Sequence, residues 1–432
     1  MMSLITRARL EVEDYLRWNP VARILLHHRA LRKARLCRSQ ETSAILRSVD
    51  QLCAAARFAP NPEAMQRAEK MILECIRPLD LTEVDWREAV PNVEKRRMGK
   101  AVVLKPRISP MEKGVVLVSF EDQWARLLWN CNLEEFSDSY TLVLSPSWSP
   151  PHSLINCLFP TAYPGPIFCL ISNTKDLQIF PHLSKRYVMV PLFASSWVNP
   201  DLYKPLPFEK KDVSILMLAN FGKYKRHFLL FKALREMPAS ARVLLIGQED
   251  GDRCSDTIMA EARAYGVQNR FELVVNAPHS TVIEALCRAK ISVILSRREG
   301  SCVAVVESMF ANTPVGLFKD AEIGSRVYIN ESTGRFLQYR NLSGQLMNFI
   351  ATAHRYSPRA WAEKNISCFR STNILNDTLK THALAIGQTW TQDISVHQWR
   401  PDPQLLSADD RARMQASYDD IEARFGIVVG TD

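Results

Sequence analysis

The sequence lacks the long apolar run that a membrane-spanning helix requires. No stretch approaches the roughly 20 apolar residues needed to cross a bilayer. Its N-terminus also has no apolar block followed by a small-residue cleavage site, which a secretory signal peptide would show. We therefore expect a cytoplasmic protein.

Paired cysteines are missing as well. The ten cysteines are scattered along the chain, with no C-x-x-C pair and no nearby histidines at zinc spacing. We expect reduced thiols and no metal ligand set.

Several nucleotide and nucleic-acid motifs are absent. No strand is followed by G-x-G-x-x-G, and Gly222-Lys223 lacks the spacing of a P-loop, which argues against a nicotinamide dehydrogenase. The chain has no zinc finger, helix-turn-helix signature or aromatic ladder beside its basic residues, which argues against nucleic acid as a partner. No short-period repeat occurs, so a solenoid is excluded.

The positive charge is concentrated near the N-terminus. The net charge is +9, and residues 1–107 hold 21 Lys/Arg against 13 Asp/Glu, an excess of eight. Between Arg23 and Arg38 basic residues interleave with leucines and Ile24, a basic amphipathic pattern. We expect residues 1–40 to make peripheral contact with an anionic membrane. The alternative is a solvated helix with a basic face.

The order of apolar patterns predicts an α/β fold with two Rossmann-like domains. Long helical periodicities without a convincing strand fill the first part, and alternating strands and helices follow. A loop with Lys204-Pro205-Leu206-Pro207 and a charged stretch after it have the composition of an interdomain linker. The domains expected are a basic helical extension (1–98), a first Rossmann-like sheet domain (99–205), a second Rossmann-like sheet domain (206–390) and a helical tail (391–432).

Strands of each sheet domain are predicted from short β-branched or apolar runs. Those of the first domain are 101–104, 114–120, 140–144, 167–171 and 187–190. Those of the second are 215–218, 243–246, 271–275, 291–295 and 315–318.

The most informative feature is the junction between the strand at 291–295 and a short helix at 303–311. Glu299 lies just past the end of the strand, and Glu307 lies in the second turn of the helix. The first turn exposes free N–H groups and a partial positive charge, so Gly300, Ser301, Cys302 and Val303 form a candidate anion site. A carboxylate such as Glu307 can accept two hydrogen bonds from a vicinal diol such as ribose. The pair suits a sugar-nucleotide ligand.

From about Ser214 to Leu337 the chain resembles the nucleotide-sugar-binding half of the family 4 glycosyltransferases, which have the GT-B fold. The resemblance is carried by Glu299 through Val315, which is similar to the family's E-x7-E segment and the strand entry behind it. It is supported by Lys225 through Leu234, a lysine opening a helix that ends in Ala-Leu, and by the strand 243–246 with Gly247.

The resemblance implies a role for each of these residues. Glu307 would hold the ribose hydroxyls, and Glu299 would hold hydroxyls of the transferred sugar. Lys225, together with the amides of residues 300–303, would neutralise the diphosphate, because fixed cations and helix-end dipoles stabilise a leaving diphosphate. Neither a metal nor another cofactor is then required. The expected reaction moves a hexosyl group from a UDP- or GDP-sugar to a glycan or lipid-linked acceptor with retention, as in polysaccharide biosynthesis.

The chain departs from the family pattern at two positions. Asn220 stands where most members have an arginine, which leaves Lys223 or Arg226 to compensate at the diphosphate. Cys302 stands where a glycine is common, so a side chain crowds the approach of the backbone to the ligand. Two readings other than transfer stay open: a GT-B-like binding or scaffold protein that has lost catalysis, and a nucleotide-sugar epimerase.

A histidine of the first domain often lies near the sugar in this family. His152 is better placed for this role than His182, because it follows the loop 145–151; the alternative is a loop histidine exposed to solvent. Trp148 in that loop would either cap the domain core or stack on a sugar face.

Overall fold

The computed structural model describes residues 2–36, 41–86, 95–147, 151–399 and 402–430. The chain divides into two compact units. The C-sheet unit comprises Met1–Tyr15 and Ser195–Ser367, and the N-sheet unit comprises Leu16–Ala194 and Cys368–Asp432. Trp148 lies outside the described residues.

The C-sheet unit is built on a parallel sheet with the strand order β12-β11-β10-β7-β8-β9. The central strands are runs of buried Val, Ile and Leu, the pattern of a sheet covered on both faces. The chain runs from β7 outward to β9 and then returns to β10 on the other side of β7, so the order reverses between β7 and β10. The strands are β7 (Val213–Leu218), β8 (Val243–Gly247), β9 (Glu272–Val275), β10 (Ala289–Ile294), β11 (Val315–Phe318) and β12 (Gly334–Leu337).

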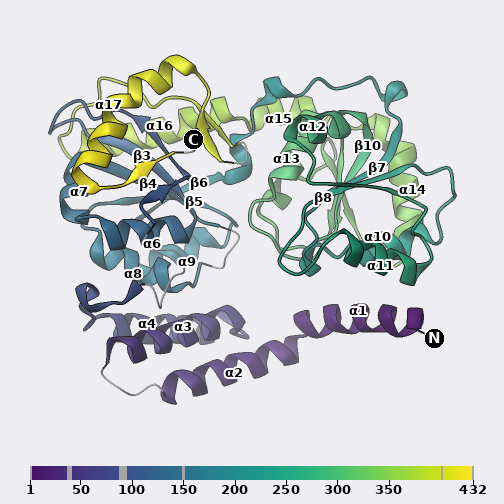
Figure 1. Ribbon diagram of the computed structural model, residues 1–432, viewed down its shortest axis with the longest axis horizontal. Coiled ribbons are helices and arrows are strands. Elements are labelled where there is room, and N and C mark those ends of the chain that lie inside the picture. The colour runs from purple at the N-terminus through teal and green to yellow at the C-terminus, as the bar shows by residue number, and fades with distance from the viewer. Residues whose placement is uncertain (1, 37–40, 87–94, 148–150, 400–401, 431–432) are drawn as a thin grey trace. The chain divides into compact units, whose positions relative to one another are not determined.

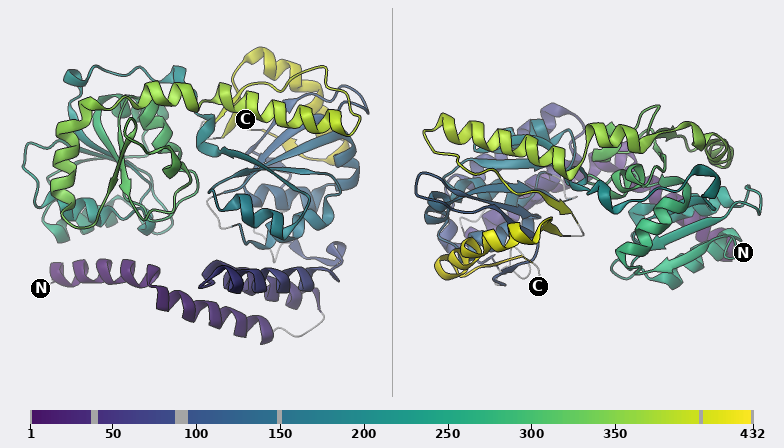
Figure 2. Two further views of the ribbon diagram at one scale, coloured as in Figure 1. Left: turned by 180° about the vertical axis from the view of Figure 1, so that it is seen from behind. Right: turned by 90° about the horizontal axis from the view of Figure 1, so that it is seen from above.

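Helices cover both faces of this sheet (Figures 1 and 2). The helices are α10 (His227–Leu234), α11 (Ser255–Tyr265), α12 (His279–Arg288), α13 (Val303–Phe310), α14 (Leu342–Thr352) and α15 (Pro358–Asn365). Short 3-10 turns complete the unit: η2 (Ala194–Trp197), η3 (Pro200–Leu202), η4 (Phe208–Lys210), η5 (Lys223–Lys225), η6 (Gly324–Tyr328) and η7 (Ala353–Arg355).

The N-sheet unit has the strand order β2-β3-β4-β5-β6, in which β2 is antiparallel to β3 and the other pairs are parallel. Helices α6, α8 and α9 cover one face, and α7, α16 and α17 lie on the other side (Figure 1). The strands are β2 (Ala101–Lys105), β3 (Gly114–Ser119), β4 (Tyr140–Ser145), β5 (Ile167–Ile171) and β6 (Tyr187–Phe193). The helices are α6 (Glu121–Asn130), α7 (Leu133–Ser139), α8 (Leu154–Ala162), α9 (Asp176–Leu183), α16 (Cys368–Ala385) and α17 (Ala408–Phe425).

The N-terminal extension is helical. After α1 (Met2–Trp18), the helices α2 (Pro20–Leu36), α3 (Thr42–Phe58) and α4 (Pro62–Ile76) pack on one another around small side chains such as Ala30, Ala55 and Ala68. Small residues let helix axes approach closely, and α3 and α4 also contact α8. A 3-10 turn, η1 (Leu81–Glu83), follows.

The C-terminal residues contribute strands as well as helices, which the sequence did not predict. Strands β13 (His397–Trp399) and β14 (Pro403–Leu405) form a hairpin, and β15 (Val428–Val429) pairs in parallel with β1 (Arg97–Met98). Helix α16, expected in the second sheet domain, belongs to the N-sheet unit. Two- and three-residue strands carry too little periodicity to be recognised in a sequence, and long-range packing decides where α16 lies.

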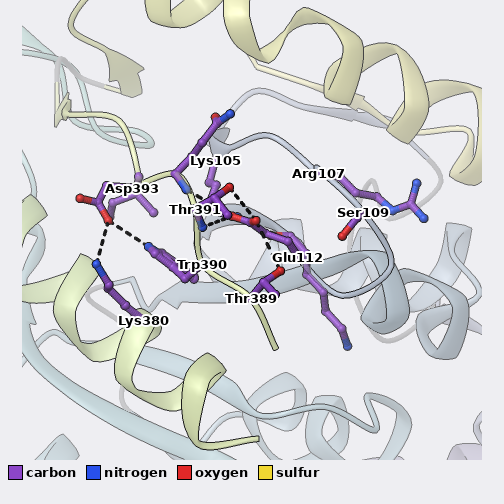
Figure 3. A network of polar contacts seen from close by, with 12 residues as sticks. Lys105, Arg107, Ser109, Glu112, Lys380, Thr389, Trp390, Thr391 and Asp393 are labelled. Carbon is purple, nitrogen blue, oxygen red and sulfur yellow. Dashed lines mark hydrogen bonds and ion pairs between the residues drawn. The ribbon is translucent and has the colours of Figure 1, made fainter. Parts of the chain in front are cut away.

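A buried ion pair of Lys105 and Glu112 holds the segment between α16 and β13 in the N-sheet unit. Figure 3 shows Glu112 between Lys105 and the residues around Thr391. Glu112 accepts hydrogen bonds from Lys105 Nζ at 2.9 Å, from the Thr391 backbone N–H at 2.8 Å and from the Thr391 hydroxyl at 2.8 Å. Burial alone would raise the pKa of Glu112, but these hydrogen bonds outweigh it and lower the pKa to about 2.

The fold class predicted from the sequence is confirmed: both sheet units are Rossmann-like, with a helical extension before them and helices after them.

Candidate donor site

The candidate site lies at the point where the strand order of the C-sheet reverses. Strands β7 and β10 are parallel neighbours, so the loops that follow them leave the same edge of the sheet. Open α/β sheets bind ligands in the crevice at such a point. The first loop carries Lys225, and the second carries Glu299.

Lys225 and Glu299 meet there. Lys225 Nζ lies 2.7 Å from Glu299 Oε2, and both side chains are largely buried. Burial alone would lower the pKa of Lys225, but the charge of Glu299 outweighs it and raises the pKa above its usual value. Glu299 Oε1 is buried and has no hydrogen-bond partner among the described residues. The pair therefore holds a fixed ammonium at the site together with an acceptor oxygen that a hydroxyl group could use.

Residues 300–303 lead from this pair into α13. Cys302 is the N-cap residue and takes the left-handed conformation, with φ at 51°. In the described part of the chain, the backbone N–H groups of Gly300, Ser301 and Cys302 have no acceptor. The loop is held from behind, because Gly324 N–H donates to the Gly300 carbonyl and Ser195 N–H donates to Ser301 Oγ. Its donors and the partial positive charge of the helix end can face an anion.

Cys302 differs from a reactive thiol. Burial raises its pKa well above the usual value, and the charge of Glu299 adds to the effect. The thiol therefore stays protonated and contributes bulk at the start of α13.

Glu307 is oriented by two residues that the sequence did not single out. Its Oε1 accepts from the Tyr203 hydroxyl at 3.1 Å and lies 3.0 Å from His279 Nε2. Tyr203 follows η3, and His279 opens α12 right after Pro278. With Oε1 occupied, Oε2 is the oxygen left to meet a diol.

Other residues of the loop that carries Lys225, and the first residue of α10, have specific environments. Asn220 donates from its amide to the Tyr224 hydroxyl at 2.8 Å, and its Oδ1 is buried without a partner among the described residues. His227 is buried, and burial lowers its pKa to about 3, with the charges of Arg253 and Lys225 adding to the effect. Its ring is therefore neutral at physiological pH.

Lys223 and Arg226, predicted to compensate for Asn220 at the diphosphate, both make ion pairs with α1. Lys223 Nζ lies 3.2 Å from Glu13, and Arg226 lies 2.8 Å from Asp14. Arg226 also donates to the Tyr339 hydroxyl at 3.0 Å and is 3% exposed. Neither partner could be found by local sequence reasoning, because α1 is more than 200 positions away.

His152 belongs to the N-sheet unit and is buried rather than exposed in a loop. Its Nε2 lies 2.8 Å from Glu69 Oε1, and the other carboxylate oxygen of Glu69 lies 3.4 Å from His182. Glu69 comes from α4, so both histidines contact the helical extension. The interpretation of His152 as a solvent-exposed loop histidine is wrong, because α4 covers it.

The part of the chain that holds this site is similar to a known family. Residues 199–343 match the model of the family described as glycosyl transferases group 1. The match spans about a third of the chain and includes the loops that follow β7 and β10. The resemblance to the GT-B glycosyltransferases drawn from the sequence is thus confirmed, and it covers the strand-end lysine, Glu299 and Glu307.

Two solved structures are similar to this chain. Sucrose-phosphate synthase from Thermosynechococcus elongatus is 15% identical and matches with a TM-score of 0.50, covering 63% of this chain and 74% of that one. HepE from Anabaena in complex with UDP is 12% identical, with a TM-score of 0.49 over 61% of this chain and 78% of that one. At such identity the likeness to the synthase concerns the fold alone. No curated protein matches the chain in sequence.

Two features are absent from the described residues. None of their helices is both long and apolar enough to span a membrane. Within the same residues, no group of three or more His, Cys, Asp or Glu side chains is arranged to hold a metal ion.

Proposed function

We propose that this glycosyltransferase domain binds a UDP- or GDP-sugar and that the protein transfers the hexosyl group to a glycan or lipid-linked acceptor. The observation that carries the proposal is the Lys225–Glu299 pair beside the unpartnered amides of residues 300–302 at the switch point of the sheet. The ammonium and the amides can bind the diphosphate of a nucleotide sugar, and the carboxylates can accept hydrogen bonds from its sugar and ribose hydroxyls.

In the proposed reaction the bond between the sugar and the diphosphate breaks while charge develops on the leaving phosphate. Lys225 and the amides of the α13 end are fixed in place before the reaction and can stabilise that charge without reorganising. Glu299 Oε1 and Glu307 Oε2 hold hydroxyls of the sugar and of the ribose. Under this proposal no metal is needed, and the departing phosphate accepts the proton of the acceptor hydroxyl on the same face, with retention of configuration.

The place of action is proposed as well. The protein works in the cytoplasm and contacts an anionic membrane through residues 1–40, where a lipid-linked acceptor would be presented. Support comes from α2, which carries five Arg or Lys residues and no acidic residue.

Thermal unfolding in the presence of ligands tests the donor proposal. The purified chain is heated with UDP, GDP, ADP, CMP and common nucleotide sugars, each with and without EDTA. Ligand at about 100 times its Kd stabilises the folded state by roughly 2.7 kcal/mol, so one nucleoside diphosphate should raise the midpoint by several degrees. The shift should be the same with EDTA. A shift that EDTA abolishes would contradict metal independence.

A second candidate function has one observation in its favour. Asn220 replaces the expected arginine, and both Lys223 and Arg226 are already paired with α1, so the site has few cations left for a diphosphate. This is what a GT-B-fold binding protein without catalysis would show. No shift with any nucleotide would select this candidate.

A further inference from the structure

Helix α1 carries exposed large apolar side chains, most of them on the side opposite its ion pairs with the C-sheet unit. Their spacing of three, four and seven positions places them along one side of a helix. The exposed residues and their exposed fractions are Leu4 64%, Ile5 60%, Val12 54%, Tyr15 66% and Leu16 54%. A surface helix of a globular protein ordinarily shows the opposite arrangement.

The other face of α1 is attached to the C-sheet unit by charge. Among the side chains of α1 that the structure describes, Leu10 alone is buried. Three carboxylates make ion pairs with that unit: Glu11 with Lys232 at 2.9 Å, Glu13 with Lys223 at 3.2 Å and Asp14 with Arg226 at 2.8 Å. Polar contacts thus fix the helix and leave its apolar face unpartnered in the described structure.

The composition of the next helix, α2, indicates what kind of surface covers the apolar face of α1. Helix α2 begins two residues after α1 ends, and its exposed side chains combine Val21, Leu25 and Leu36 with Arg29, Arg32 and Lys33. Exposed apolar residues flanked by cations fit the interface of an anionic bilayer. A second copy of the chain would bring the same cations against one another, so charge favours the lipid surface.

We propose that α1 lies in the interface of an anionic membrane, with Leu4, Ile5, Val12, Tyr15 and Leu16 inserted and its acidic face still bound to the C-sheet unit. The helix is 17 residues long, or about 25 Å, and lies in the membrane plane rather than across it. This inference deepens the proposed membrane contact of residues 1–40, on which it rests. It adds that the donor-binding unit itself is attached to the membrane.

One ion pair of α1 lies next to the proposed donor site. Arg226, bound to Asp14, is the next residue after Lys225. The loop that holds the ammonium of the donor site is therefore linked to the membrane-bound helix, which would keep the donor close to a lipid-linked acceptor.

The test is binding of the full chain to vesicles of phosphatidylcholine with and without phosphatidylglycerol. A variant with Leu4→Asp and Val12→Asp places two charges in the inserted face and should lower the partition coefficient on anionic vesicles at least tenfold. The matched control, Leu384→Asp with Ile386→Asp, changes two apolar residues of similar exposure in and just after α16 and should bind like the parent.

Each contrary outcome is specific. Equal binding of the α1 variant and the parent to vesicles overturns the proposal. So does the result that the parent binds no vesicles and is a dimer in sedimentation equilibrium, while the α1 variant is a monomer. Loss of binding only on replacement of the α2 cations would keep a membrane contact but remove α1 from it. Nucleotide-induced thermal shifts should be equal in the variant and the parent, so failure of this inference is separable from failure of the donor site.

Discussion

At the scale of single residues, the contacts of Glu307 determine how its carboxylate would meet the proposed ribose diol. Tyr203 and His279 both use Oε1, so the orientation of the carboxylate is fixed and Oε2 is left for the ligand. A carboxylate whose orientation is already fixed binds a ligand more tightly than a mobile one, because less conformational entropy is lost on binding.

We expect Glu307→Gln to weaken binding of the nucleoside diphosphate about tenfold or more. A hydrogen bond to a charged group contributes roughly 1.5–3 kcal/mol, and the amide of glutamine is a poorer acceptor for the ribose diol. Isothermal titration with the nucleotide selected by the thermal scan measures the change. Glu331→Gln, an exposed residue of the same unit, is the control. Unchanged affinity in the Glu307 variant would remove this residue from the site.

Lys225→Met should lower kcat about a hundredfold or more with little change in the fold. The substitution removes the fixed charge that stabilises the leaving diphosphate, an effect typical of lost transition-state electrostatics. Turnover of the nucleotide sugar and far-UV circular dichroism are measured together. Lys232→Met, which removes an exposed ammonium paired with Glu11, serves as control. Activity retained in the Lys225 variant would refute the proposed role.

At the scale of elements, the buried ion pair of Lys105 and Glu112 holds the segment between α16 and β13 against strand β2 and the loop that follows β2. Lys105 also lies over the Trp390 ring at 4.7 Å, so the aromatic ring covers the ion pair. Such a pair is costly to break from one side, because the remaining charge stays buried.

This pair gives a stability contribution that depends on pH. Because the folded-state pKa of Glu112 is lowered to about 2, the contribution is present above the unfolded pKa of about 4.5 and is lost as pH falls toward 2. The difference corresponds to on the order of 3 kcal/mol.

We expect Glu112→Gln to lower the urea midpoint at pH 7 and to make stability less dependent on pH between 4.5 and 2. Glu74→Gln, an exposed carboxylate of α4, should behave like the parent. If the Glu112 variant loses as much stability on acidification as the parent, another carboxylate governs the transition. Urea unfolding followed by tryptophan fluorescence at several pH values provides the comparison.

At the scale of the whole molecule, the proposed membrane contact depends on the exposed charge of the basic extension. Helix α2 is held by small buried residues against α3, which leaves its cations toward solvent. Exposed cations contribute little to the folding of their own unit and are available to a partner.

Replacing Arg29, Arg32 and Lys33 by glutamine should lower binding to anionic vesicles about a hundredfold at low salt. Each cation near an anionic surface contributes roughly 1 kcal/mol, and salt screens the attraction. Co-sedimentation at increasing salt measures both effects. Removing residues 1–40 should abolish the binding as well, although that deletion also uncovers Ala55 and Ala56. Binding that is indifferent to salt and to these substitutions would return α2 to a solvated helix.

The sequence by itself determined ten of the strands of the two large sheets, the helix that begins at residue 303, and the placement of Lys225, Glu299 and Glu307 after strands and in α13. It missed β12 and the short strands β1, β13, β14 and β15. These features depend on apolar periodicity and turn residues within a few positions, which a sequence displays directly. The apolar runs of β7, β8 and β10 are clear enough to locate these strands in the sequence, and with them the edge of the sheet where Lys225 and Glu299 lie.

Only the tertiary structure decided which groups meet. It brought His279 and Tyr203 to Glu307, Glu69 to His152, and Asp14 to Arg226 across 212 positions of the chain. It also turned the apolar face of α1 outward, because ion pairs with the C-sheet unit fix the opposite face. Contacts at such separations are set by how whole elements pack, and no local pattern specifies them.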